Sequence, residues 1–283
     1  MDKKKTNKRI SIQIATRDRP SELGILLQSL RTQTYKEWDL VIVDDGTMNI
    51  MATAYIPLLL NRMKMEGHCV NIIKNDLHIG VCHCRNLAVE KDYFDNDYIA
   101  RLDDDVIIEH DYLEKLIKVI NAGYDIASGV TPGMSYPTIE RKTSHVKQFI
   151  NKKEFDKEGT LTRHDDECAY GYEEETITPT HEFRSNALMK KEVANKISYP
   201  DNLSPVGFRE EGFFSTKAII EGYKIGVITS AIAWHFQTPS GGCKHPDYGG
   251  KVQSDNNYFV KWNKQLFVKH GDFLKKYYDE ATL

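Results

Sequence analysis

The most distinctive chemistry in this sequence is a run of three carboxylates, Asp103-Asp104-Asp105, directly after the apolar stretch Tyr98–Leu102. Three carboxylates within one turn repel each other unless a cation or a basic side chain lies among them. Oxygen ligands of this kind suit a hard divalent cation, Mg²⁺ or Mn²⁺, which also binds the phosphates of a substrate. Aspartate also caps helices after strands, which is the simpler interpretation of any one of the three. The complete triplet favours a cation site.

Two other polar segments follow apolar stretches in the same way. They are Thr16-Arg17-Asp18-Arg19 after Ile10–Ala15, and Asp44-Asp45-Gly46-Thr47 after Asp39–Val43. Helix capping would explain each segment alone. A carboxylate after the second strand can accept hydrogen bonds from a base or ribose, and Arg85-Asn86 behind Gly80 can bring a cation and an amide to a nucleotide. Together these residues predict a site for a nucleoside diphosphate.

The elements that must position these residues alternate between strand and helix patterns. We expect strands at Ile10–Ala15, Asp39–Val43, Val70–Lys74, Tyr98–Leu102 and Tyr124–Val130, and helices at Pro20–Arg31, Met51–Met65, Val81–Val89 and Tyr112–Ile120. Such alternation predicts βαβ units and a mostly parallel sheet. Ligands bind such sheets at the carboxyl ends of the strands, which is where the polar segments lie.

The second half of the chain has a different character. Residues Thr131–Glu182 are polar and predict a loop or insertion that shapes a substrate cleft, with a partly disordered segment as the alternative. After it we expect strands at Phe183–Lys190, Tyr223–Thr229 and Ala231–His235, and helices at Glu210–Glu221 and Tyr258–Lys269. Residues 238–250 are rich in Gly and Pro and predict a mobile loop.

The composition excludes several classes of protein. The 283 residues carry 38 Lys and Arg against 41 Asp and Glu, so the chain lacks the basic surplus of a general nucleic-acid binder. No apolar run approaches the ~18 residues of a membrane span. The five cysteines are odd in number and unevenly spaced, which indicates reduced thiols in a cytoplasmic protein. Lys3, Lys4 and Lys5 form either a solubilising tail or a weak contact with the inner face of a membrane.

Four elements in order give the chain a specific resemblance. They are Ser11–Arg19, Val41–Thr47, Gly80 with Arg85-Asn86-Leu87-Ala88, and Leu102-Asp103-Asp104-Asp105 as a DxD element. This arrangement resembles the family 2 glycosyltransferases of the GT-A fold. The resemblance implies an α/β fold with a mixed central sheet. A Rossmann-like half that binds the nucleotide-sugar would span residues 1–130, and an acceptor-binding and catalytic half would span 131–283, in one continuous domain.

The resemblance also implies roles for single residues. Those implied to bind the nucleotide-sugar are Thr16, Arg17, Asp18, Asp44, Asp45, Arg85, Asp103 and Asp104. Asp105 would bind the metal, and His235 at the end of a late strand would be a second ligand. The family's catalytic base lies in an acidic pair that opens a helix. Here Glu211 takes the position of the usual Asp, so an acceptor would have to sit slightly further back.

The implied activity is an inverting, metal-dependent transfer of a single sugar. The donor would be a nucleotide-sugar, with UDP favoured because it is the commonest donor nucleotide of the family, and the acceptor a hydroxyl of a glycan or lipid-linked molecule. The chain lacks the Gln-x-x-Arg-Trp element of processive synthases, which favours one addition per encounter. The loop at 238–250 could close over the diphosphate. Two alternatives remain: a module that binds nucleotide-sugar or glycan without turnover, and a haloacid-dehalogenase-type phosphatase with Asp103 as nucleophile.

Overall fold

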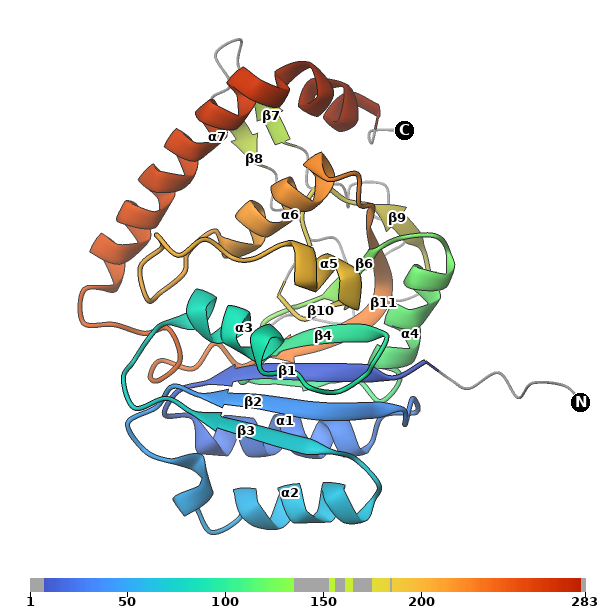
Figure 1. Ribbon diagram of the computed structural model, residues 1–283, viewed down its shortest axis with the longest axis vertical. Coiled ribbons are helices and arrows are strands. Elements are labelled where there is room, and N and C mark those ends of the chain that lie inside the picture. The colour runs from blue at the N-terminus through green and yellow to red at the C-terminus, as the bar shows by residue number, and fades with distance from the viewer. Residues whose placement is uncertain (1–7, 135–152, 156–160, 165–174, 184, 281–283) are drawn as a thin grey trace, which may run out of the picture.

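The computed structural model describes residues 8–134, 153–155, 161–164, 175–183 and 185–280. Its strands are β1 (Ile10–Thr16), β2 (Trp38–Asp44), β3 (Val70–Lys74), β4 (Tyr98–Asp103), β5 (Val106–Ile108), β6 (Ile126–Val130), β7 (Lys153–Phe155), β8 (Leu161–His164), β9 (Ile177–Pro179), β10 (Ala187–Lys190) and β11 (Ile225–His235). Its helices are α1 (Pro20–Arg31), the 3₁₀ turn η1 (Ile50–Ala52), α2 (Ile56–Met65), α3 (Val81–Glu90), α4 (Tyr112–Asn121), α5 (Lys191–Lys196), α6 (Glu210–Ile220) and α7 (Tyr248–Glu280). Figure 1 shows the arrangement.

A nine-stranded mixed sheet forms the centre of the molecule. Its order is β3-β2-β1-β4-β10-β6-β11-β5, with β9 also paired to β11. The first four strands are parallel, β10 runs antiparallel to β4 and β6, and β6 and β11 are parallel. Thr16 pairs in register with Asp44, and its neighbour Ala15 pairs with Asp103. The register therefore brings the ends of β1, β2 and β4 to one edge.

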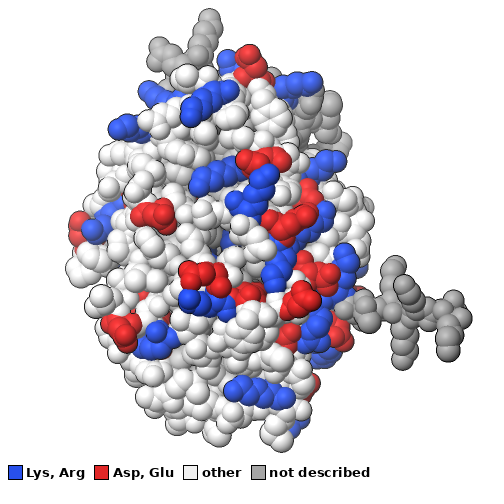
Figure 2. Space-filling view, in the orientation of Figure 1, with Lys and Arg blue, Asp and Glu red and all other residues white. Residues whose placement is uncertain are grey.

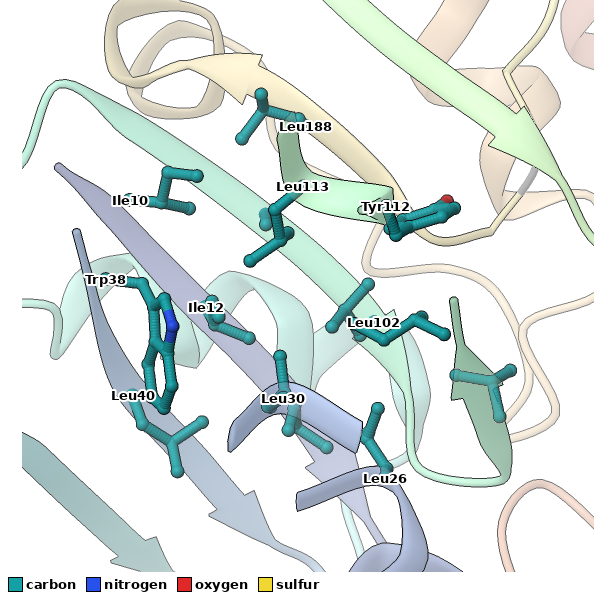
Figure 3. Packing of buried hydrophobic residues seen from close by; sticks show 14 of the residues in the cluster. Ile10, Ile12, Leu26, Leu30, Trp38, Leu40, Leu102, Tyr112, Leu113 and Leu188 are labelled. Carbon is teal, nitrogen blue, oxygen red and sulfur yellow. The ribbon is translucent and has the colours of Figure 1, made fainter. Parts of the chain in front are cut away.

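Side chains alternate across this sheet and build an apolar core on each face. Ile10, Ile12 and Ile14 of β1 are fully buried against the face that α1, α2 and α4 cover, and Figure 3 shows the packing of Ile10 and Ile12 with Leu26 and Leu30 of α1. The opposite face is covered by α3, α5, α6 and α7. Burial on both faces explains why the strands read as nearly continuous apolar runs. By packing on both faces, the helices fix the position of the sheet, and with it the edge that carries the polar residues.

Several elements differ from the sequence expectations. The expected strands at 223–229 and 231–235 form one strand, β11, whose pairing with β6 shifts register between Val227 and Ile232. The last helix begins at Tyr248 rather than Tyr258, so its first turn takes up the end of the expected 238–250 loop. Neither β5 nor α5 was expected, because each is too short for a periodic pattern. Strand β10 begins at Ala187 rather than Phe183.

Four further predictions from the sequence concern the surface charge, membrane-spanning helices, two polar segments and the division of the chain at residue 130. On the face drawn in Figure 2, acidic and basic side chains are interspersed rather than gathered by sign. No helix among the described residues is long and apolar enough to cross a membrane. The Lys3–Lys5 segment and most of the polar segment 131–182 lie outside the described residues. The sheet contains strands from both sides of residue 130, and the division into two halves there stays a prediction.

Candidate active site

A cavity of about 520 Å³ lies at the carboxyl ends of β1 and β4. Its lining includes these residues of the predicted site: Thr16, Arg17, Asp45, Arg85, Asp103, Asp104, Asp105 and His235. Glu210 also lines it, while Glu211, Asp18 and Asp44 are not among the lining residues. The structure therefore brings together most of the predicted site residues, although they come from five different elements and loops.

The aspartate triplet divides its side chains between different partners. Asp104 accepts hydrogen bonds from the Thr16 hydroxyl at 2.8 Å and from Arg19 Nη1 at 3.0 Å. The same Arg19 nitrogen lies 3.0 Å from Asp105 Oδ2, so one guanidinium pairs with two neighbouring carboxylates. Asp103 pairs instead with Arg85, at 3.0 Å. The repulsion expected within the triplet is thus relieved by two arginines.

Burial and these partners shift the pKa values of the triplet in different directions. Burial raises the pKa of Asp103, with Arg85 opposing, and raises that of Asp104 to about 7 although Arg19 opposes it. Burial would also raise the pKa of Asp105, but the hydrogen bond and charge of His235 and the charge of Arg19 hold it below the usual value. Asp105 is therefore the member of the triplet that stays ionised most readily.

Asp105 and His235 form the part of the cavity that suits a divalent cation. Asp105 Oδ1 and His235 Nε2 lie 3.1 Å apart. Adjacent ligands of an octahedral ion, each at ~2.1 Å, would be separated by about 3.0 Å. No group of three or more His, Cys, Asp or Glu side chains in the described part of the chain could hold a metal. Two protein ligands completed by substrate phosphates and water match the way Mg²⁺ binds in phosphate sites.

The acids that follow β1 and β2 mainly hold loops in place. Asp44 is fully buried and accepts from the backbone N–H groups of Gly46 and Ile50, both at 3.0 Å. Asp18, in the left-handed region with φ of 55°, accepts from the N–H and hydroxyl of Thr47 at 2.8 and 3.0 Å. Burial would raise the pKa of Asp18, yet its hydrogen bonds to Met48 and Thr47 lower it. Both acids are committed to these turns.

The Asp45 carboxylate also accepts several hydrogen bonds, most of them from residues just before α3. It accepts hydrogen bonds from Asn75, from the N–H groups of Ile79 and Gly80, and from His78 Nδ1 at 2.6 Å. Gly80 has a φ of +87°, and a Cβ there would lie 2.6 Å from Pro205 Cα. A side chain at this position would therefore both strain the backbone and collide with the next loop. His78, which lines the cavity beside Asp45, was missed by the sequence reasoning because a single His carries no pattern.

Arg85 connects the DxD element to the acidic pair of α6. Its Nη1 lies 3.0 Å from Glu210 Oε1 and 3.2 Å from Glu211 Oε1, and its Nη2 lies 3.0 Å from Asp103 Oδ1. Ser185 donates to the same Glu211 oxygen at 2.7 Å. The pKa of Glu210 is raised well above its usual value, by burial first and then by the charge of Glu211. The buried Arg85 guanidinium thus contacts both Asp103, which is predicted to bind the donor, and Glu211, the predicted base.

The loop that follows β11 is hydrogen-bonded to the segment that follows β1. Arg19 Nε donates to the Ser240 carbonyl at 3.0 Å, and the Gly242 N–H donates to the Arg17 carbonyl at 2.8 Å. Arg17 Nη1 in turn donates to the carbonyls of Gly242 and Lys244, both at 3.2 Å. Gly242 has a φ of +53°, which favours glycine, and a Cβ there would lie 2.4 Å from Arg19 Nη1, so that side chain would have to move. The loop therefore borders the cavity, with its lid function remaining a prediction.

A comparison with protein families assigns the chain. The model of the family "Glycosyl transferase family 2" matches residues 11–198, a span that runs from β1 to just beyond α5 and includes the DxD element. The chain belongs to glycosyl transferase family 2. The range matched in this family 2 chain includes the aspartate triplet, and no curated protein matches the chain.

Solved structures with the same fold are glycosyltransferases. S. aureus TarS 1-349 in complex with UDP-GlcNAc matches with a TM-score of 0.55 and 17% identity, covering 83% of this chain and 60% of that one. The mannosyltransferase PcManGT from Pyrobaculum calidifontis, with GDP-Man and Mn²⁺, has a TM-score of 0.56 and 14% identity, covering 82% and 58%. GalNAc-T7 with UDP, GalNAc and Mn²⁺ has a TM-score of 0.63 and 14% identity, covering 84% and 45%. The predicted GT-A fold is confirmed.

The length of these relatives limits the comparison. The family 2 chain spans 37% of the longest TarS structure and about 60% of TarS 1-349. At 14–17% identity the similarity shows the fold. What the chain itself binds and transfers must therefore be argued from its own site.

Proposed function

We propose that this chain is an inverting glycosyltransferase that moves a single sugar from a nucleotide-sugar, first of all a UDP-sugar, to a hydroxyl of a glycan or lipid-linked acceptor. One observation carries the proposal. Arg85 joins the DxD residue Asp103 to the acidic pair Glu210-Glu211 at the rim of a single cavity, so donor-binding and proton-accepting groups meet there. A chain that only bound nucleotide would not need a buried acidic pair beside its diphosphate site.

The donor would extend from the end of β1 toward α6. Thr16, Arg17, His78 and Asp45 line the cavity and would surround the nucleoside, with Asp45 acting mainly through His78. Asp103 would contact the ribose or donor sugar, and Arg85 would hold that carboxylate in place. Asp18, Asp44 and Asp104 would shape this pocket through the loops and the Arg19 side chain that they hold.

The diphosphate would lie against Asp105 and His235. These two side chains would hold Mn²⁺ or Mg²⁺, which when bound neutralises the charge of the departing diphosphate. Arg19 lines the same cavity 3.0 Å from Asp105 Oδ2 and would face the same charge. The loop that carries Ser240 and Gly242 would exclude water from the anomeric carbon.

Glu211 would act as the base. Its Oε1 is held by Ser185 and Arg85, so the carboxylate is fixed at the start of α6. An acceptor hydroxyl would donate its proton to Glu211 as its oxygen attacks the anomeric carbon from the side opposite the diphosphate. The carbon–oxygen bond to the diphosphate breaks in the same step, and the configuration inverts.

A donor panel tests the proposal. Thermal unfolding is followed with UDP-, GDP- and CDP-sugars, each with and without Mn²⁺. A nucleotide-sugar at ~100 times its Kd stabilises the fold by about 2.7 kcal/mol, and UDP-sugars with Mn²⁺ should give the largest rise. If no nucleotide raises the melting temperature in Mn²⁺, the proposal is wrong.

The same experiment, followed by product analysis, separates the alternatives. Binding of a nucleotide-sugar with neither transfer nor donor hydrolysis would indicate a binding module. The family match is to glycosyl transferases, so the phosphatase interpretation gains no support. Release of inorganic phosphate from a phosphomonoester, with no response to nucleotide-sugars, would be needed to revive it.

A further inference from the structure

A buried arginine that packs against α6 has no role in the sugar transfer proposed for this site. Arg101 lies on β4, two residues before Asp103, and only 4% of its surface is exposed. No acceptor among the described residues lies in good hydrogen-bond geometry to any of its three guanidinium nitrogens. Burying a charge without a hydrogen-bonded partner is costly, so a residue of this kind calls for a physical explanation.

Two aromatic rings hold the Arg101 guanidinium in place of hydrogen bonds. Its central carbon lies 4.7 Å from the centre of the Tyr199 ring and 4.6 Å from that of Phe214. Such contacts stabilise a desolvated cation through the negative faces of the rings. The central guanidinium carbon of Arg85 lies 5.3 Å from the centre of the same Tyr199 ring. Phe214 belongs to α6, about one turn beyond Glu210 and Glu211. Arg101 is therefore packed directly behind the residues that hold the acidic pair.

Three carboxylates share one guanidinium beside the acidic pair. Arg85 lies within 3.2 Å of the carboxylates of Asp103, Glu210 and Glu211, and the charge of His235 also acts on Asp103. Cys82, Tyr199, Cys243 and Tyr248 also lie near the pair. Burial first of all raises their pKa values, so they are neutral and supply no positive charge. Arg101 adds a further positive charge to this cluster. Because the rings hold it, that charge binds neither carboxylate oxygen and leaves them open to other partners.

We propose that Arg101 is a positioning residue for the acidic pair: its charge, held between Tyr199 and Phe214, favours the ionised form of the pair and so keeps Glu211 able to accept a proton. The proposal rests on the role of Glu211 proposed above. A guanidinium bound directly to Glu211 would compete with an acceptor hydroxyl, whereas one held by aromatic rings acts through its field alone. This division leaves Arg85 to orient the carboxylates and Arg101 to set their charge.

The test is a titration of the pair itself. The protein is labelled with carbon-13 at glutamate side-chain carboxyls, and the two signals are assigned from Glu210→Gln and Glu211→Gln. Arg101→Met removes the charge and keeps an apolar, flexible side chain between the rings, while Arg101→Lys keeps the charge. We expect Arg101→Met to move the titration of the pair upward by about one pH unit. Arg101→Lys should leave it within about a third of a unit of the wild-type value.

The outcome separates an electrostatic role from a packing role. If Arg101→Met lowers the melting temperature but the pair titrates as in the wild type, Arg101 is only a packing residue and the proposal is wrong. If Arg101→Met does not fold, Arg101→Gln takes its place. If neither neutral variant folds, the wild-type titration decides, because a pair that holds both protons at neutral pH contradicts the proposal and a pair with one carboxylate ionised supports it. The titration needs no substrate, so its failure and a failure of the donor panel are separate results.

Discussion

Replacing Arg85 with Met removes the guanidinium that three carboxylates share. Its contacts to Asp103, Glu210 and Glu211 are 3.0, 3.0 and 3.2 Å long, and the side chain is 10% exposed. A hydrogen bond to a charged group contributes about 1.5–3 kcal/mol, which sets an upper bound of about 4.5–9 kcal/mol if three were lost independently. The cavity admits water and the carboxylates can take up protons, so we expect a loss near the 3–5 kcal/mol typical of a broken buried pair.

The loss should depend on pH in a definite direction. Burial raises the folded-state pKa values of Asp103 and Glu210 and Arg85 opposes that rise, so without Arg85 both values rise further above their unfolded values. A raised carboxyl pKa favours the fold at low pH and penalises it as pH rises, so Arg85→Met should cost more at about pH 8 than at about pH 5. Urea unfolding at both pH values measures this difference. Arg62→Met is the control, because Arg62 forms an exposed ion pair with Glu66 and its loss should cost at most ~1 kcal/mol at either pH. An equal loss at both pH values for Arg85→Met would refute the reasoning.

Three further predictions follow from the site and its scaffold. Glu211→Gln should keep nucleotide-dependent stabilisation but lower transfer by about 10²–10⁴-fold, and a variant that transfers normally removes Glu211 from the mechanism. Asp105→Asn should abolish the part of the UDP-sugar stabilisation that needs Mn²⁺, measured by thermal shift with and without the ion; a retained metal dependence would place the ion elsewhere. Gly80→Ala should lower the free energy of unfolding by about 1–3 kcal/mol through backbone strain and collision with Pro205. Gly67→Ala has a comparable φ of +95° with open space around it and should cost less, so equal losses in urea unfolding would contradict the collision argument.

Much of the structure of residues 1–130 was predictable because its signals are local. Apolar runs marked β1, β2, β3 and β4, and the polar residues after them marked the edge at which the cavity lies. The second half was harder to predict, since α5 is short and β11 changes its pairing midway along its length. In the first half, β5 was missed because it is only three residues long. The extent of α7 was also missed, because its first turns are rich in Gly and polar residues that read as a loop.

The sequence alone determined most of the strands and helices of residues 1–130 and which of their ends carry polar residues, because hydrophobic periodicity and capping act over a few residues. The partners of those chemical groups were decided only by the tertiary structure. Arg85 meets Glu210 across 125 positions, and Arg19 meets Asp104 across 85. Asp18, Asp44 and Asp45 look equivalent in sequence, yet the fold commits the first two to backbone turns and sets the third against His78. Which carboxylate stays free to react depends on its burial and on charged side chains of other strands and helices. Neither can be read from the residues next to it in the sequence.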